Sequence, residues 1–177
     1  MIVEPKTDFG TYISNYADFP TQGILFRDIS PLLASQVGMT AAIDRFEESL
    51  SCYNIDMIAG IESRGFLFST LLAMRLKVGS IMIRKPGKLP GDLAFKKYEL
   101  EYGSSELTLQ KQAGLEERNV LIVDDLLATG GTLAAAKSLL VEQRANVIAC
   151  AVVIELLALN GREKLDLPIV ALKAYDD

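Results

Sequence analysis

The chain has 177 residues, enough for one domain with a sizeable core, and 50% of them are hydrophobic. Its longest uninterrupted apolar run, residues 147–154, suits a buried strand and is far too short to span a membrane. The formal net charge of −5 argues against a general nucleic-acid surface, and the absence of histidine excludes Ser-His-Asp and Cys-His nucleophiles and histidine-ligated zinc.

The chain begins without a basic segment followed by an apolar one, so we expect no secretory signal. Its two cysteines, Cys52 and Cys150, fall in apolar surroundings and make no metal-binding spacing. We therefore expect both to be reduced thiols in the core of a cytoplasmic protein that has no membrane or nucleic-acid partner.

The amino-terminal part of the chain is weakly patterned. We expect a short helix around residues 8–16. In residues 19–31, turn residues alternate with large apolar ones, unlike a regular helix or a buried strand. On the residues alone, Phe26 is more often an ordinary core aromatic than a ligand contact.

Helical spacing of apolar residues predicts a core-packing helix over residues 37–53, to which we assign no chemistry. Residues 57–61 then form a buried apolar run, which predicts a strand, and residues 66–76 predict a helix. Between them, Arg64 follows the strand end, and its planar guanidinium suits phosphate oxygens. Seen alone, the turn is more often a solvated helix cap.

Residues 81–83 predict a short strand, and the two prolines and two glycines in residues 86–91 forbid regular structure after it. Basic residues prevail here although the protein is acidic elsewhere, which suggests a mobile cationic flap over a polyanion. A solvated hairpin tip is the alternative. Residues 84–97 hold one acid, Asp92, and five basic residues: Arg84, Lys85, Lys88, Lys96 and Lys97.

Residues 98–103 alternate apolar and charged side chains, which predicts a strand, and residues 106–111 predict its hairpin partner. Glu101 would usually be a surface carboxylate of such a strand. Because the chain has no histidine, however, a carboxylate is also a natural proton carrier.

The most informative stretch is residues 120–132. Its apolar start predicts a buried strand that stops at Asp124 and Asp125, followed by a small-residue turn and a helix over residues 133–144. Amides at a helix start bind phosphate, and paired carboxylates accept sugar hydroxyls or hold a hard cation. The pattern therefore suggests a sugar phosphate with a free diol. A solvated Asp-Asp turn in a βαβ unit is the plain alternative.

The carboxyl-terminal part predicts a core strand over residues 147–154, a short helix over residues 161–165 and a last strand over residues 168–172. Strands alternate with helices and no repeat or linker interrupts them. This order favours an α/β fold.

Residues 120–132 resemble the signature with which type I phosphoribosyltransferases bind 5-phosphoribosyl-1-pyrophosphate, and residues 126–132 are similar to the form found in members that use adenine. Further matches extend from Phe19 to about Leu165. The resemblance implies one domain with a mostly parallel twisted sheet flanked by helices. It also implies an amino-terminal hood of about residues 1–35, a core of about 36–177 and a flexible β-hairpin flap of about 84–103.

By resemblance, the activity is transfer of phosphoribose to N9 of adenine, which gives AMP and pyrophosphate in purine salvage, with Mg²⁺ held mainly through substrate oxygens near the two acids. A homodimer and, at residues 62–65, a non-proline cis peptide are also implied. The implied catalytic residues are Glu101, Lys88, Arg64 and Tyr102. The implied adenine contacts are Leu25, Phe26, Arg27 and Leu126. Those to phosphoribosyl pyrophosphate are Asp124, Asp125, Ala128, Thr129, Gly130, Gly131, Thr132, Ser63, Arg64, Arg84 and Lys88.

Two alternatives remain at this point. One is a transferase for hypoxanthine or guanine, whose relatives typically present a lysine late in the chain to the 6-oxo group. The other is a regulator that keeps the phosphoribosyl site as a sensor and binds nucleic acid, although the acidic charge balance counts against it.

Overall fold

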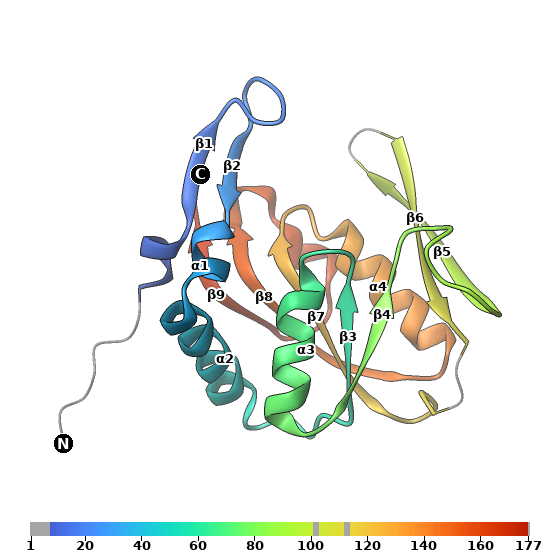
Figure 1. The fold of residues 1–177 in the computed structure, drawn as a ribbon. Helices are drawn as coiled ribbons and strands as arrows, with labels where there is room; N and C mark the ends of the chain where they lie inside the picture. Colours follow the sequence, from blue (N-terminus) through green and yellow to red (C-terminus); the bar gives the residue numbers. More distant parts are fainter. Residues whose placement is uncertain (1–7, 101–102, 112–113, 177) are drawn as a thin grey trace, which may run out of the picture. The chain divides into compact units, whose positions relative to one another are not determined.

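The computed structural model describes residues 8–100, 103–111 and 114–176. The chain divides into two compact units, Met1–Arg45 and Phe46–Asp177. The predicted hood falls inside the smaller unit, and the larger unit contains a five-stranded sheet (Figure 1). A helix that we predicted from its apolar spacing, α2 (Gln36–Leu50), runs across the boundary between the units.

The five-stranded sheet has the order β4-β3-β7-β8-β9, and every neighbouring pair is parallel. This confirms the predicted parallel α/β fold. Because parallel strands end at one edge, residues after β3 and β7 lie close together there. The strands are β3 (Met57–Ile61), β4 (Gly79–Ile83), β7 (Asn119–Leu127), β8 (Asn146–Leu156) and β9 (Ile169–Tyr175).

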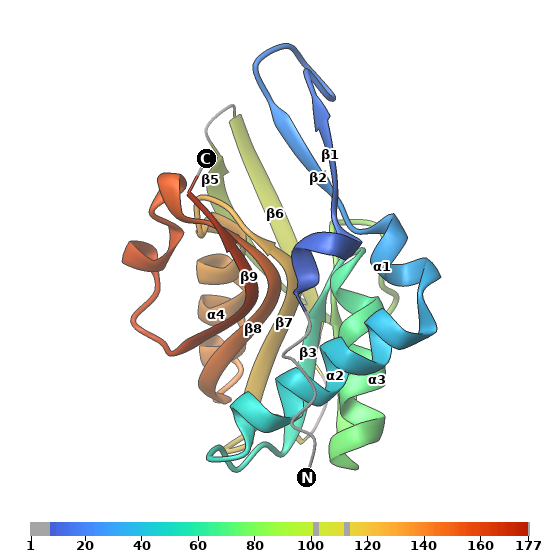
Figure 2. The same cartoon turned by 90° about the vertical axis from the view of Figure 1, so that its left-hand side faces the viewer.

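Two helices cover opposite faces of this sheet, α3 (Gly65–Leu76) on one and α4 (Gly131–Glu142) on the other (Figure 2). The central strands are therefore buried on both faces, which explains their continuous apolar sequences. Val120 to Val123 and most of β8 have almost no exposed surface.

Strand β7 corrects one prediction. We expected it to stop at Asp124, but it continues through both acids to Leu127, because Asp124, Leu126 and Leu127 pair with β8. Two carboxylates inside a buried strand break the apolar pattern from which its length was predicted.

The predicted flap is more regular than its composition suggested. Strand β5 (Leu93–Leu100) starts five residues before the predicted Tyr98 and pairs antiparallel with β6 (Gly103–Gln110). Within the described residues of the flap, the stretch between β4 and β5 has no helix or strand. Ala94, Leu107 and Leu109 are buried in the core cluster that also contains residues of α4, so the hairpin base belongs to the core.

The smaller unit also departs from prediction. Where we expected a helix over residues 8–16, it has a 3₁₀ turn, η1 (Phe9–Tyr12), and then β1 (Ser14–Ala17). β1 pairs with β2 (Leu25–Asp28), and α1 (Ser30–Ala34) follows. These half-exposed elements depend on a hairpin turn in which the Asp18 carboxylate accepts a hydrogen bond from the Gly23 N–H at 2.7 Å.

Two 3₁₀ turns, η2 (Leu157–Leu159) and η3 (Gly161–Lys164), join β8 to β9, and η3 confirms the predicted short helix. Among the residues the structure describes, none of the helices has both the length and the apolar character needed to cross a bilayer.

Candidate active site

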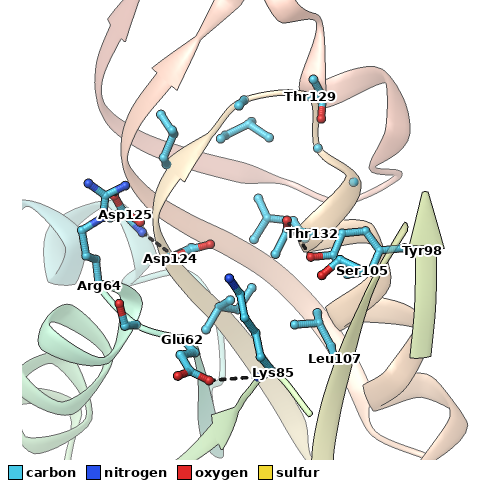
Figure 3. Close-up of a pocket in the computed structure, with 18 residues that line it drawn as sticks. Glu62, Arg64, Lys85, Tyr98, Ser105, Leu107, Asp124, Asp125, Thr129 and Thr132 are labelled. Carbon is cyan, nitrogen blue, oxygen red and sulfur yellow. Dashed lines mark hydrogen bonds and ion pairs between the residues drawn. The ribbon is translucent and has the colours of Figure 1, made fainter. Parts of the chain in front are cut away.

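A cavity of about 410 Å³ opens at the carboxyl edge of the sheet, inside the larger unit (Figure 3). Its walls come from the ends of β3 and β7, the start of α4 and the β5–β6 hairpin. The lining residues are Ile61, Glu62, Ser63, Arg64, Lys85, Tyr98, Ser105, Leu107, Asp124, Asp125, Leu126, Leu127, Ala128, Thr129, Gly130, Gly131, Thr132 and Leu133.

The two predicted acids lie side by side in this cavity. Asp124 and Asp125 are only 8% and 7% exposed, respectively. The Asp125 N–H donates to the Asp124 carboxylate at 2.9 Å, and the Arg64 guanidinium lies 2.8 Å from the Asp125 carboxylate. The ion pair ties the turn after β3 to the end of β7, so three predicted ligand-binding residues meet at one place.

Burial raises the pKa of both carboxyl groups above their ordinary values. At Asp124 the negative charge of Asp125 adds to this effect, and the pKa is raised well above its usual range. At Asp125 the Arg64 guanidinium opposes the rise. Both carboxyl groups are therefore harder to ionise than free aspartates, and hydroxyl donors or a cation would favour their charged forms.

The turn between β7 and α4 has the geometry of an anion site. Gly130 has a positive φ of 77°, and α4 starts at Gly131 without a capping side chain. First-turn amides of a helix are hydrogen-bond donors without intrahelical acceptors, and the helix dipole favours negative charge there. Residues 128–132 all line the cavity, so these donors are available to a phosphate.

The loop that contains Gly161 packs against this turn. A Cβ atom built on Gly130 would lie 2.3 Å from the carbonyl oxygen of Gly161, and one on Gly161 would lie 2.2 Å from that of Ala128. The two main chains therefore touch, and no larger residue fits at either position. Sequence reasoning missed Gly161, because the contact joins segments that are far apart in the chain.

The loop that carries Gly161 is anchored by an ion pair. Glu155, only 3% exposed at the end of β8, accepts a hydrogen bond from Arg162 Nη2 at 2.6 Å. Arg162 also donates to the carbonyl oxygen of Ile169. A carboxylate directly after eight apolar residues was the available sequence signal, and we assigned it no role.

The turn after β3 forms the opposite wall. The Glu62–Ser63 peptide bond is cis, as the family resemblance implied. A Cβ on Gly65 would lie 2.7 Å from the Val123 carbonyl oxygen, so α3 can start here only with glycine. Ser63 and Arg64 are held against the cavity, where we predicted them.

Glu62 organises the start of the flap. It accepts hydrogen bonds from Arg84 at 3.2 and 3.3 Å and from the Lys85 N–H at 2.9 Å. Although partial burial raises the pKa of Glu62, the bonds from Arg84 and Lys85 and the charges of Arg84 and Lys88 outweigh it and lower the pKa below its usual value. Glu62 is thus ionised and fixes the chain direction after β4.

Of the predicted flap cations, Lys85 lines the cavity, whereas Arg84 and Lys88 do not. Arg84 is engaged by Glu62 and by the Lys88 carbonyl oxygen, and its guanidinium lies over the Phe66 ring. We did not assign Lys85 to the site. Its position within the predicted basic stretch was a signal that sequence reasoning left unused.

The hairpin contributes three lining residues that we did not predict, Tyr98, Ser105 and Leu107. The Tyr98 hydroxyl lies 3.4 Å from the Thr132 hydroxyl (Figure 3). Glu101 and Tyr102, the predicted catalytic pair, lie outside the described residues.

The predicted adenine contacts divide between the two units. Leu25, Phe26 and Arg27 belong to β2 of the smaller unit, where Arg27 donates to the Asn15 side chain at 2.7 Å. The Phe26 ring meets the Phe19 ring edge-on, with centroids 5.1 Å apart. Leu126 lines the cavity of the larger unit.

The carboxylates of the cavity are the candidate ligands for a divalent cation. Three or more His, Cys, Asp or Glu side chains do not converge as a metal site anywhere in the described ranges. Two buried carboxylates remain, and they suit a hard cation that prefers oxygen ligands and takes the rest from water or phosphate. Asp124 and Asp125 therefore fit Mg²⁺ carried by a substrate rather than a metal caged by protein.

The known proteins that this chain resembles are phosphoribosyltransferases. The phosphoribosyl transferase domain family matches residues 32–170. The adenine phosphoribosyltransferase of Gluconobacter oxydans is 49% identical over 170 residues, which are 96% of this chain and 95% of the relative.

Solved structures of adenine phosphoribosyltransferases have the same fold. The one from Thermoanaerobacter pseudethanolicus has a TM-score of 0.91 at 42% identity and covers 94% of this chain and 98% of its own. The one from Saccharomyces cerevisiae, with a TM-score of 0.88 at 43% identity and 93% and 96% coverage, is complexed with D-2,5-dideoxy-2,5-imino-altritol 1,6-bisphosphate and adenine.

Proposed function

This chain belongs to the adenine phosphoribosyltransferase family, and from that premise we propose that it transfers phosphoribose from phosphoribosyl pyrophosphate to N9 of adenine. The products are AMP and pyrophosphate, and the role is purine salvage. The main support for this proposal is one cavity in which buried acids, a cationic wall and a phosphate-binding turn meet. The yeast relative, complexed with an iminoaltritol bisphosphate and adenine, supports this choice of ligands.

Each part of the cavity suits one part of the sugar substrate. The amides and hydroxyls of Thr129 to Thr132 take the 5′-phosphate, because they supply donors at the positive end of α4. Asp124 and Asp125 accept hydrogen bonds from the ribose diol, which offsets the cost of their burial. Ser63 and Arg64 take the pyrophosphate with Lys85, and Arg84 and Lys88 complete that cationic side.

Separate anchoring of the sugar's three polar parts fixes it for in-line displacement. As the bond to pyrophosphate breaks, the anomeric carbon gains positive charge, and the leaving oxygens gain negative charge. Arg64 and Lys85 then stabilise the departing group, and the acids beside the ribose favour the developing cation. N9 of adenine forms the new bond from the opposite side.

Magnesium fits this arrangement near Asp124 and Asp125, with most of its ligands from substrate oxygens. When bound, it neutralises part of the pyrophosphate charge and makes that group a better leaving group. Arg64 is already paired with Asp125, so this chain alone supplies limited positive charge next to the acids.

For the base, we assign stacking on the adenine ring to Phe26 and further contacts with the base to Leu25, Arg27 and Leu126. Glu101 accepts the proton released from N9, with Tyr102 closing onto the site. This assignment follows the resemblance of residues 19–31 and 100–103 to the adenine-using members of the family.

We further propose a homodimer that works in the cytoplasm. On α3, Leu67, Leu71 and Met74 are 45%, 43% and 77% exposed and recur at helical spacing, so they form an apolar stripe suited to a second copy. Cys52 and Cys150 are both free thiols, which suits a reducing compartment, but Cys52 is exposed and does not lie in the core as we expected.

The proposed function is tested by measuring nucleotide formation from labelled adenine, hypoxanthine and guanine, each with phosphoribosyl pyrophosphate and Mg²⁺. Adenine should give AMP with a kcat/KM at least about 100-fold above the 6-oxopurines, because buried polar groups matched to one base reject the other. Preference for hypoxanthine or guanine would replace adenine as the substrate. Nucleic-acid binding without AMP formation would identify a regulator.

A further inference from the structure

A contact between two hydroxyl groups in the cavity joins the hairpin to the phosphate-binding turn. Tyr98, on β5, has its hydroxyl 3.4 Å from Oγ1 of Thr132, in the first turn of α4. Both side chains line the cavity, and Figure 3 shows the tyrosine pointing from the hairpin toward Thr132. Among the residues that the structure describes, neither hydroxyl has another hydrogen-bond partner, so the contact links two elements through one pair of hydroxyl groups.

The hairpin side of this contact is firmly held. Residues 94, 96 and 98 share one face of β5, because side chains alternate along a strand. Ala94 is buried in the core with residues of α4, and the Lys96 ammonium lies 2.6 Å from the Glu142 carboxylate at the other end of α4. Tyr98 itself packs against the same core cluster. Its hydroxyl therefore reaches Thr132 from a fixed position.

The direction of this hydrogen bond follows from what the turn binds. A hydroxyl group has one proton to donate and two lone pairs to accept with. If Thr132 donated to Tyr98, its lone pairs would face a bound phosphate and repel it. If Tyr98 donates to Thr132, the Thr132 proton is free to point at a phosphate oxygen.

We propose that Tyr98 is a positioning residue for the 5′-phosphate, donating its hydroxyl proton to Thr132 so that Thr132 donates its own to the phosphate. A separation of 3.4 Å is long for two hydroxyl groups, and a phosphate that draws the Thr132 proton should shorten it. The hairpin thereby strengthens the phosphate site without contacting the phosphate. This inference depends on the proposed function in one respect only, which is that phosphoribosyl pyrophosphate is the full substrate.

The test is Tyr98→Phe, which removes the hydroxyl and keeps the ring that packs on the core. Calorimetry with ribose 5-phosphate measures the 5′-phosphate site alone, and calorimetry with Mg²⁺-pyrophosphate measures the other side of the cavity. Ribose 5-phosphate affinity should fall about 5- to 10-fold, the effect of one lost hydrogen bond, while pyrophosphate affinity stays unchanged. In turnover assays the KM for phosphoribosyl pyrophosphate should rise by a similar factor, with kcat and the KM for adenine little altered.

A double-mutant cycle separates positioning from packing. In a Thr132→Val background, Tyr98→Phe should have no further effect, because the tyrosine acts through the threonine hydroxyl. Thr132→Ser, which keeps a hydroxyl, should retain the sensitivity to Tyr98→Phe. The control is Tyr53→Phe, which changes a tyrosine outside the cavity and should leave all affinities at wild-type values.

Unchanged ribose 5-phosphate affinity in Tyr98→Phe would overturn the inference, as would equal losses in the wild-type and Thr132→Val backgrounds. A parallel fall in pyrophosphate affinity would do the same, since it indicates a general disturbance of the cavity. These binding results do not depend on which base is used. A protein that binds ribose 5-phosphate through Tyr98 but makes no AMP would refute the proposed function alone.

Discussion

The guanidinium of Arg64 lies 2.8 Å from the carboxylate of Asp125, joining the turn after β3 to the end of β7 across the cavity floor. The two groups neutralise each other before any ligand is bound, and Arg64 opposes the rise that burial causes in the Asp125 pKa. A ligand that binds to Arg64 or Asp125 therefore has to rearrange their ion pair.

Asp125→Asn should weaken binding of phosphoribosyl pyrophosphate. The amide keeps the shape of the side chain but loses the charge that pairs with Arg64, and its nitrogen cannot accept a hydrogen bond from the ribose. We expect an increase in KM of about 10- to 100-fold, as for lost hydrogen bonds to a charged group. Steady-state kinetics measures this, with Asp44→Asn, at an exposed position of α2, as the control. A KM equal to that of the wild type would remove Asp125 from the ribose site.

Glu101→Gln should lower turnover more than affinity. If Glu101 takes the N9 proton, the amide binds the base but cannot accept the proton, and kcat should fall about 100-fold or more. KM values for both substrates should change by less than a few-fold. Glu106→Gln, on β6 outside the cavity lining, is the matched carboxylate control. Equal losses in kcat for the two variants would contradict a catalytic role for Glu101.

Gly161→Ala should displace the phosphate-binding turn, because the main chain of Gly161 packs against it. The added methyl group would meet the Ala128 carbonyl oxygen at 2.2 Å and the Gly130 nitrogen at 3.0 Å, so the turn must shift. We expect ribose 5-phosphate affinity to fall about tenfold and stability to fall by about 1–3 kcal/mol, as for overpacking. The comparison variant is Gly79→Ala, whose methyl group meets the Met57 side chain at 2.9 Å. Because the end of the methionine side chain can move away, this variant should cost little stability and no affinity; similar affinities for both variants would refute the role of Gly161 in supporting the turn.

The lowered pKa of Glu62 predicts a pH-dependent contribution to stability. A carboxyl group whose pKa is lower when folded stabilises the protein above its unfolded pKa, and this contribution is lost as pH falls through the folded value. The stability difference between wild type and Glu62→Gln should therefore be largest above about pH 5 and shrink below the ordinary glutamate pKa of roughly 4.3. Urea unfolding across this range measures it. A difference that stays constant with pH would show that ionised Glu62 contributes nothing.

The two cysteines should differ sharply in reactivity. Burial raises the pKa of the Cys150 thiol to about 12, whereas Cys52 is exposed. Because the thiolate is the reactive form, a disulfide reagent at neutral pH should label one thiol per native chain and two after denaturation. Rapid labelling of Cys150 in the native protein would contradict its burial in β8, within the core cluster that also contains residues of α4.

The sequence was sufficient for the parts of the molecule whose signals are local. Strand β3 was predicted to the residue, because both of its faces are covered and its apolar run is continuous. The family resemblance assigned the acids, the glycine turn and Arg64 to one ligand, and they gather because the ends of parallel strands share one edge. All of these line the cavity.

The parts that could not be predicted depend on contacts between distant segments. Asp124 and Asp125 broke the apolar pattern, so the last residues of β7 were missed. Gly161 meets Gly130, and Tyr98 meets Thr132, across gaps of about 30 residues that no periodicity reports. The β1–β2 hairpin, largely exposed, had no apolar face to mark its strands.

In the proposed complex, Asp124 and Asp125 hold the ribose while residues 129–132 hold its 5′-phosphate. A crystal of the protein soaked with phosphoribosyl pyrophosphate and Mg²⁺ tests it most directly. The account predicts density for the 5′-phosphate against the Gly130 to Thr132 amides, with both ribose hydroxyls within about 3 Å of the two carboxylates. A sugar bound with its pyrophosphate on the α4 turn, or away from both acids, would contradict it.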